Sequence, residues 1–354
     1  MRQTIPMLGR NTGFTLVELM IALTLSLFLL GAITYVVVNS NKNYNTTDSL
    51  ARLQENARFA VEFLARDLRR AGYMGCANDV TEVNSTLNGG KYGGGTGGFA
   101  VNSLEGAENI GASTVWEPSG ATVSFTNTPV AGSDAVAIRY LDLNNPIGVT
   151  KEMPNESAVL YVNPGHGLKE GDIIAVTDCD GADIMQLTNV NPAGAASSGK
   201  DGLVHNAGGS NPGNSTQKLK RSYGVDSTVL KFGSFAYYIA NNSSNRPALF
   251  RETTSGTEEL VEGVESMQVR YGEVTGSDRS PTRYSTADDV DNWQNVVSVR
   301  IGFLFSTIAN TADGQYGTDV DTGTYNVNGT DIDPADERRL RKVFVSTIML
   351  RNVR

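Results

Sequence analysis

The residues whose types and spacing could support chemistry lie near the N-terminus: Gly13, Phe14 and Glu18. Glu18 is the only charged residue in the apolar run 14–38. A cut after the small Gly13 would create an α-amine on Phe14, about one helical turn from Glu18. A central charge in a membrane helix costs ~2.5–3.5 kcal/mol on insertion scales, so such residues usually have a partner. The spacing predicts that Glu18 pairs with an α-amine of its own chain or of a neighbour. The alternative is a carboxylate near the helix end that extends to the membrane interface.

The apolar run predicts a membrane-spanning helix over residues 14–38. As a helix, this segment would rise ~37 Å, which is enough to cross the hydrocarbon core of a bilayer. Arg2 and Arg10 precede the run and no basic residue follows it until Lys42, which favours a cytoplasmic N-terminus. A cleaved signal peptide is the alternative. It would have a shorter apolar core and a small-x-small site after it, whereas residues 39–49 read NSNKNYNTTDS.

A second helical pattern continues over residues 39–71. Asp48 is a suitable N-cap for it, and Gly72 is a suitable stop. Because asparagine is a poor helix former, we expect a kink or local melting in the Asn-rich residues 39–47. Apolar residues recur every three or four positions and so share one face: Leu50, Leu53, Ala57, Ala60, Leu64, Leu68 and Ala71.

Residues 72–354 predict a large head made mainly of short antiparallel strands. Its loops, at residues 88–98, 191–214 and 311–336, are rich in glycine, asparagine, serine and aspartate. We expect an α+β fold, in which a long N-terminal helix, first transmembrane and then amphipathic, packs on a loop-rich β head. A split of the head near residue 220 is an alternative. Seven segments have strand-like composition: 135–141, 158–162, 172–177, 228–240, 264–271, 296–305 and 343–350.

Composition and motifs argue against several classes of function. The net charge of −9 would repel a nucleic acid, so we expect no nucleic-acid partner. The two histidines, His166 and His205, lie in Gly/Asn/Pro-rich stretches without a catalytic or metal motif. Residues 93–98 fit G-x-G-x-x-G, but no strand precedes them and no helix follows, as nucleotide binding would require. We therefore expect neither enzymatic activity nor a cofactor.

Two cysteines, Cys76 and Cys179, lie in the head. They are too few for a disulfide scaffold or a four-thiolate zinc site, but sufficient for one bridge. Because the head is expected outside the cytoplasm, where disulfides persist, we predict a Cys76–Cys179 bond. Two buried thiols are the alternative.

An acidic insertion at residues 313–337 is similar in composition to calcium-binding loops. It departs from the EF-hand spacing, because Gly323 stands where the third ligand should be and Thr324 replaces the glycine. A solvated loop is therefore the main prediction, with calcium binding as the alternative. The basic residues that follow, including Arg339 and Arg341, predict a solvated strand edge.

The N-terminal residues carry a family resemblance. The stretch GFTLVELMIAL (13–23) resembles the class III signal of type IV pilins and of type II secretion pseudopilins. The head resembles PilW-type minor pilins in RLQENARFAVEFLARDLRRAGYMGC (52–76), VTDCDGADIMQLTN (176–189), LVEGVESMQVRYG (260–272) and VVSVRIGFLFST (296–307). The closing RKVFVSTIMLRN (341–352) is also similar to J-type pseudopilins.

The resemblance implies how the chain is processed and where it acts. A prepilin peptidase would remove the leader, residues 1–13, and methylate the new Phe14 amine, and Glu18 would guide the subunit into a filament. The chain would be a single-pass protein of the bacterial inner membrane with a periplasmic head, which later enters the pilus at its tip. It would help to initiate pili that serve twitching motility and adhesion. Its partners would be the prepilin peptidase, the major pilin, other minor pilins, the inner-membrane assembly platform and a large tip adhesin. A J-like minor pseudopilin of a type II secretion system is the alternative.

Overall fold

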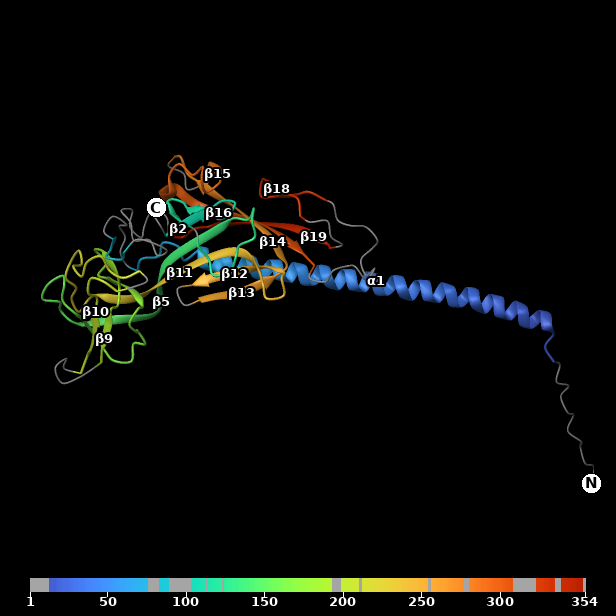
Figure 1. Cartoon of the computed structure of the whole chain (residues 1–354), viewed down its shortest axis with the longest axis horizontal. Helices are drawn as coiled ribbons and strands as arrows, with labels where there is room; N and C mark the ends of the chain where they lie inside the picture. Colours follow the sequence, from blue (N-terminus) through green and yellow to red (C-terminus); the bar gives the residue numbers. More distant parts are fainter. Residues whose placement is uncertain are drawn as a thin grey trace, which may run out of the picture.

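A long helix projects from a β-rich head, and the N-terminal end of the helix lies far from the head (Figure 1). The computed structural model describes residues 13–75, 83–88, 103–111, 114–122, 124–192, 199–209, 212–253, 256–276, 280–307, 323–334 and 339–352.

Helix α1 runs without a break from Leu16 to Leu68. The kink predicted at residues 39–47 was wrong. The Thr46 and Thr47 hydroxyls donate to the carbonyl oxygens of Lys42 and Asn43, at 2.9 and 2.8 Å, so they are satisfied inside the helix. Low helix propensity costs only tenths of a kcal/mol per residue, and the helical segments on both sides outweigh it. Asp48 is no N-cap, but lies within the helix and pairs with Arg52 at 2.9 Å.

The two halves of α1 have different surroundings. The apolar residues of the first half are exposed in the isolated chain, whereas one face of the second half enters the largest core. The predicted stripe is confirmed for Leu53, Ala57, Ala60, Leu64, Leu68 and Ala71, which are all buried, while Leu50 is half-buried. The helix ends near the predicted stop, and Gly72 adopts the left-handed conformation at φ +72°.

A four-stranded antiparallel sheet packs against this buried stripe. Its order is β15 (Arg283–Ser285), β14 (Val264–Glu273), β16 (Val296–Ser306) and β19 (Arg341–Met349). Inward-facing residues of β14 and β16, among them Val269, Ile301 and Phe303, share one core with α1.

A larger sheet of 11 strands forms the rest of the head. Its two long central strands, β5 (Ala135–Lys151) and β11 (Thr228–Asn241), pair with each other, so strands from before and after residue 220 share one sheet. Among the described strands, β1 and β8 are the one pair that is parallel. The other strands are β1 (Val83–Ser85), β2 (Leu104–Ala107), β6 (Leu160–Val162), β7 (Ile173–Thr177), β8 (Ala182–Gln186), β9 (Asn189–Asn191), β10 (Asp201–Val204), β12 (Pro247–Thr253) and β13 (Gly256–Glu262).

Small hairpins complete the head: β3 (Val115–Trp116) with β4 (Ala121–Thr122), and β17 (Tyr325–Val327) with β18 (Thr330–Ile332). A short 3-10 helix, Trp293–Asn295, precedes β16. All seven predicted strands are present, and the α+β prediction is confirmed. The sequence did not indicate the β12–β13 hairpin, because a polar strand such as β13, GTEELVE, lacks apolar alternation and depends on its neighbour for pairing.

Two carboxylates join the two sheets. Asp134 accepts from the backbone N–H of Val269 in β14 at 2.8 Å, and Glu108 accepts from Ala287 N–H at 2.9 Å. Arg270 lies near Glu108, with Nη1 and Oε2 3.6 Å apart. Burial, reinforced by the Asp134 charge, raises the pKa of Glu108 to about 7, and burial raises that of Asp134 to about 6. The join therefore contains two neighbouring acids whose pKa values are both raised, chiefly by burial.

Asp67 anchors α1 to the larger sheet. Its buried carboxylate accepts a hydrogen bond from the Tyr237 hydroxyl of β11, and from Arg251 Nη1 of β12 at 3.1 Å. Burial, followed by the Asp67 charge, raises the pKa of Tyr237 well above its usual value, so the hydroxyl remains a donor. Asp67 is not part of the apolar stripe of α1, and it is buried because the larger sheet covers it.

We expect Asp67→Asn to lower the free energy of unfolding by ~2–3 kcal/mol, because the buried network loses the negative charge and one of its two acceptor oxygens. Tyr237→Phe should cost ~1–2 kcal/mol, because one hydrogen bond to a charged group is lost. Denaturant unfolding of the detergent-solubilised chain, followed by near-ultraviolet circular dichroism, measures both. Asp48→Asn is the matched control, because its exposed pair with Arg52 contributes at most ~0.5 kcal/mol. Equal effects of Asp67→Asn and Asp48→Asn would contradict the anchoring role.

Candidate functional site

The predicted processing junction lies immediately before α1. Residues 13–15 are not helical, and the N-cap Thr15 is extended at φ −77° and ψ 152°. Gly13 and Phe14 are exposed, and 87% of Phe14 is accessible. A Cβ added to Gly13 would meet no heavy atom within 4 Å, and no left-handed φ requires glycine there. Nothing in the described part of the chain therefore requires glycine at position 13. A requirement for a small residue there is consistent with recognition by another molecule.

Glu18 and Thr15 form a capping box at the start of α1. The Glu18 carboxylate accepts from the Thr15 N–H at 2.9 Å and from the Thr15 hydroxyl at 3.0 Å, while the Glu18 N–H donates to that hydroxyl at 3.3 Å. We missed this role in the sequence, although Thr-x-x-Glu before an apolar run is its usual signature. The contact holds Glu18 in the first turn, four residues after Phe14. Pairing with an α-amine remains a prediction.

The segment that follows is suited to a lipid environment. Helix α1 is the one helix in the described residues that is long and apolar enough to cross a membrane, and its most apolar window is entirely unburied. Its serine and threonine hydroxyl groups are satisfied within the helix: Thr24 donates to Met20 O at 3.1 Å, Ser26 to Ala22 O at 2.7 Å and Thr34 to Leu30 O at 2.8 Å. Internal satisfaction of this kind is what a span without water requires.

The predicted disulfide lies partly outside the described residues, because Cys76 is not among them. Cys179 follows β7, at φ +69°. Gly75, the residue before Cys76, lies against the end of β7: a Cβ added to Gly75 would lie 3.2 Å from Thr177 Cγ2. This proximity supports the Cys76–Cys179 bond, which remains a prediction.

We expect peptide mapping of alkylated, non-reduced protein to recover Cys76 and Cys179 in one cross-linked peptide. In the chain-entropy model this bond, which closes a loop of 102 intervening residues, would stabilise the head by up to ~4–5 kcal/mol. Reduction should therefore lower the unfolding midpoint, and Cys179→Ser should lower it without further effect of reductant. Recovery of both cysteines as alkylated free thiols would contradict the bond.

Other predicted features have structural roles or cannot be placed. His205 Nε2 lies 2.9 Å from Ala158 O, and His166 Nε2 lies 3.1 Å from Asp201 Oδ2. No group of three or more His, Cys, Asp or Glu side chains suited to a metal ion occurs within the described ranges. Much of the acidic insertion 313–337 lies outside those ranges, as do residues 93–98, so calcium binding is untested. Within the insertion, residues 323–334 contain the β17–β18 hairpin.

The prediction of a solvated basic cluster before β19 was wrong for Arg341. Its side chain is only 1% exposed and forms an ion pair with Glu265, with Nε 2.7 Å from Oε2. The charge faces inward because Glu265 of the adjacent β14 supplies a buried partner, which no local sequence pattern indicated.

Two known families match the chain. The family described as the prokaryotic N-terminal methylation motif matches residues 8–34, which hold the processing junction and most of the membrane span. The family described as Type IV Pilus-assembly protein W matches residues 236–352, about a third of the chain, from β11 to the end of β19. The search of curated proteins found no match. The matches thus cover the helix start and the sheet that receives the second half of the helix. Together they support a PilW-type minor pilin related to the type IV pilus, and the apolar N-terminal helix fits a membrane anchor.

Proposed function

We propose that this pilin helps to initiate assembly of the type IV pilus and then lies at its tip. The shape of the head carries the proposal. Strands β9 and β10 lie beyond the C-terminal end of α1, on the side opposite the N-terminus (Figure 1). A subunit inside a shaft must leave room above it for the next subunit, and this head fills that room. At a tip no subunit lies above, so the extended head is accommodated there.

The N-terminal residues supply the assembly chemistry. A prepilin peptidase cleaves between Gly13 and Phe14 and methylates the Phe14 amine. Glu18 then pairs with an α-amine in the bundle formed by the α1 helices of neighbouring subunits. This pairing is favourable because the bundle is poorly solvated, so that an unpaired charge within it would cost several kcal/mol.

The partners are those of a pilus tip. They are the major pilin, other minor pilins, the inner-membrane assembly platform and a large tip adhesin. The head would act as a structural and binding element in twitching motility and adhesion, not as an enzyme. Before assembly the chain is held in the inner membrane by residues 14–38 with the head in the periplasm.

Processing should depend on the size of residue 13 and not on the stability of the fold. We expect Gly13→Arg to leave the chain folded and membrane-bound but uncleaved, because only the peptidase contacts this position. N-terminal sequencing and intact-mass measurement should show wild-type protein that begins at N-methylated Phe14. Gly9→Arg, a change of the same kind in the leader, is the control and should be cleaved. A mature wild-type chain that begins at Met1 or after residue 38 would disprove the junction.

Two substitutions separate the charge of Glu18 from its capping role. Glu18→Gln removes the charge but keeps a residue that completes a capping box, whereas Thr15→Ala removes the box and keeps the charge. We expect Glu18→Gln to reduce incorporation into sheared pili by at least roughly ten-fold, because the partner amine loses its counter-charge. Thr15→Ala should be incorporated nearly normally. Equal losses in both variants would assign Glu18 to capping alone.

A deletion strain and its complemented counterpart test where the protein acts. Deletion of the gene should remove surface pili, and antibodies to the head should label pilus ends in the complemented strain. Labelling along the whole shaft would contradict a tip location. Normal pili with a loss of protein secretion would instead favour the pseudopilin alternative.

A further inference from the structure

Strand β19 is an open edge of the smaller sheet. It pairs with β16 in one continuous register, Ser298 opposite Met349 through Ser306 opposite Arg341. No other strand in the described residues pairs with it. Its outer side therefore offers a row of backbone donors and acceptors, the usual template for addition of another strand.

The hydrogen bonds at the two ends of β19 show which residues face outward. Leu350 N–H donates to Val297 O at 2.9 Å, and Thr307 N–H donates to Leu340 O at 3.0 Å. Even-numbered residues of this strand thus direct their backbone groups to β16, and odd-numbered residues direct theirs away, because the direction alternates along an antiparallel strand. Beyond Arg341 at the start of the strand, the outward residues are Val343, Val345, Thr347 and Met349. None of them has a backbone hydrogen bond to another described residue.

Beyond Lys342, which is exposed near the start of the strand, this edge lacks the features that usually prevent association. Residues 343–349, VFVSTIM, contain no charge and no proline. Val345 and Met349 are 52% and 49% exposed. The charge of Arg341 does not discourage pairing at this edge, because its side chain is buried against Glu265. A long, uncharged edge strand is an aggregation site unless a partner covers it.

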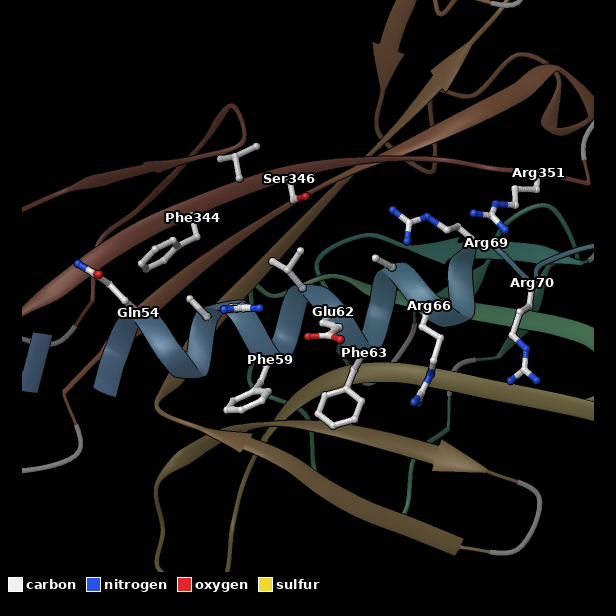
Figure 2. A pocket seen from close by; sticks show the side chains of 15 residues that line it. Gln54, Phe59, Glu62, Phe63, Arg66, Arg69, Arg70, Phe344, Ser346 and Arg351 are labelled. Atoms are coloured by element: carbon white, nitrogen blue, oxygen red, sulfur yellow. The ribbon is translucent and has the colours of Figure 1, made fainter. Parts of the chain in front are cut away.

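A positively charged groove runs between this edge and α1. Figure 2 shows its lining: Gln54, Glu62 and Arg69 come from the helix side, Phe344 and Ser346 from β19, and Arg351 follows the strand. The groove has a volume of about 1050 Å³. Its two elements end together, because Asn352 Nδ2 donates to Ala71 O at 3.1 Å.

The charge of the groove is unbalanced, although the whole chain is acidic. Five arginines line it, and Glu62 is the only acidic residue among its lining residues. No carboxylate in the described part of the chain pairs with the side chains of Arg58, Arg69 or Arg351. An occupant with carboxylates would supply the missing counter-charges.

We propose that the β19 edge and this groove bind an extended, acidic segment of a partner protein, which adds a strand to the smaller sheet. Alternate residues of that strand would be apolar, opposite Val345 and Met349, and the others would place carboxylates near the groove arginines. A partner helix does not suit this site, because its backbone groups are bonded internally and would leave the outward groups of β19 unpaired.

This inference adds to the proposed function the chemical character of one partner. It rests on the proposed function only in assuming that the head lies outside the cytoplasm. Its test uses purified protein and no pili. Failure of the assembly experiments would leave the binding result standing, and failure of binding would leave initiation and tip location unaffected.

The probe is a fluorescent peptide of alternating valine and glutamate, as long as β19. Fluorescence anisotropy measures its binding to the full chain in detergent. We expect binding that is lost when lysine replaces glutamate in the peptide, and lost when proline replaces alternate valines. Hydrogen exchange read by mass spectrometry should show that the amides of Val343, Val345, Thr347 and Met349 exchange rapidly in the free protein. The peptide should protect them, while the intervening amides are protected in both states.

Two variants test the edge and the charge separately. Val345→Pro removes an outward N–H but no bond to β16, and should weaken binding at least roughly ten-fold, which corresponds to about 1.4 kcal/mol. Retained protection of the intervening amides would show that the sheet is intact. The double variant Arg58→Gln with Arg69→Gln should weaken binding by a similar factor. Arg52→Gln, on the same helix but outside the groove, is the matched control and should bind normally.

Three outcomes would overturn the proposal. The first is equal binding of the glutamate and lysine peptides. The second is binding by the Val345→Pro variant at wild-type strength. The third is protection of the outward amides in the free protein, with dimerisation in solution, which would assign the edge to a second copy of this chain.

Discussion

The structure depends on the burial of one stripe of α1 between two sheets. Leu53, Ala57, Leu64 and Leu68 occupy the same core as the inner faces of β14 and β16 and parts of β5, β11 and β12. Small residues on the stripe let the sheets approach the helix closely, and the leucines fill the remaining space. The sheets also meet directly, where Asp134 accepts from the Val269 N–H, but much of the apolar surface that they share is completed by this stripe. The helix that anchors the protein in the membrane is therefore also the central element of its head.

Polar contacts then fix the position of the helix within that core. Asp67 accepts from Tyr237 and Arg251 of the larger sheet. Asn56 Nδ2 donates at 3.3 Å to the backbone oxygen of Glu262, in β13 of the same sheet. Burial of apolar surface alone is not directional, so it would permit the helix to slide or rotate. Directional hydrogen bonds in a dry environment remove that freedom. A force applied along α1 is thus transmitted to the head through a fixed contact.

The two ends of the chain's long axis have separate roles. The first turn of α1 carries a junction whose glycine meets nothing within the described chain, and a glutamate already satisfied by Thr15. The head carries an uncharged strand edge beside unbalanced arginines. We propose that both places act together with another molecule: a peptidase and neighbouring helices at the first, and an extended acidic strand at the second. Such incompleteness is expected of a subunit that functions in an assembly.

The sequence alone determined the features that depend on local pattern: the membrane span, the position of Gly13, Phe14 and Glu18, the buried stripe and the seven main strands. The division of the strands between two sheets came only from the tertiary structure, as did the inward turn of Arg341 and the burial of Asp67. Each of these depends on residues distant in the chain, such as Glu265 for Arg341. The unbroken helix through residues 39–47 also contradicted local propensity. Strand pairing gives no local signal of which edge stays open, so the β19 edge could be found only in the folded head.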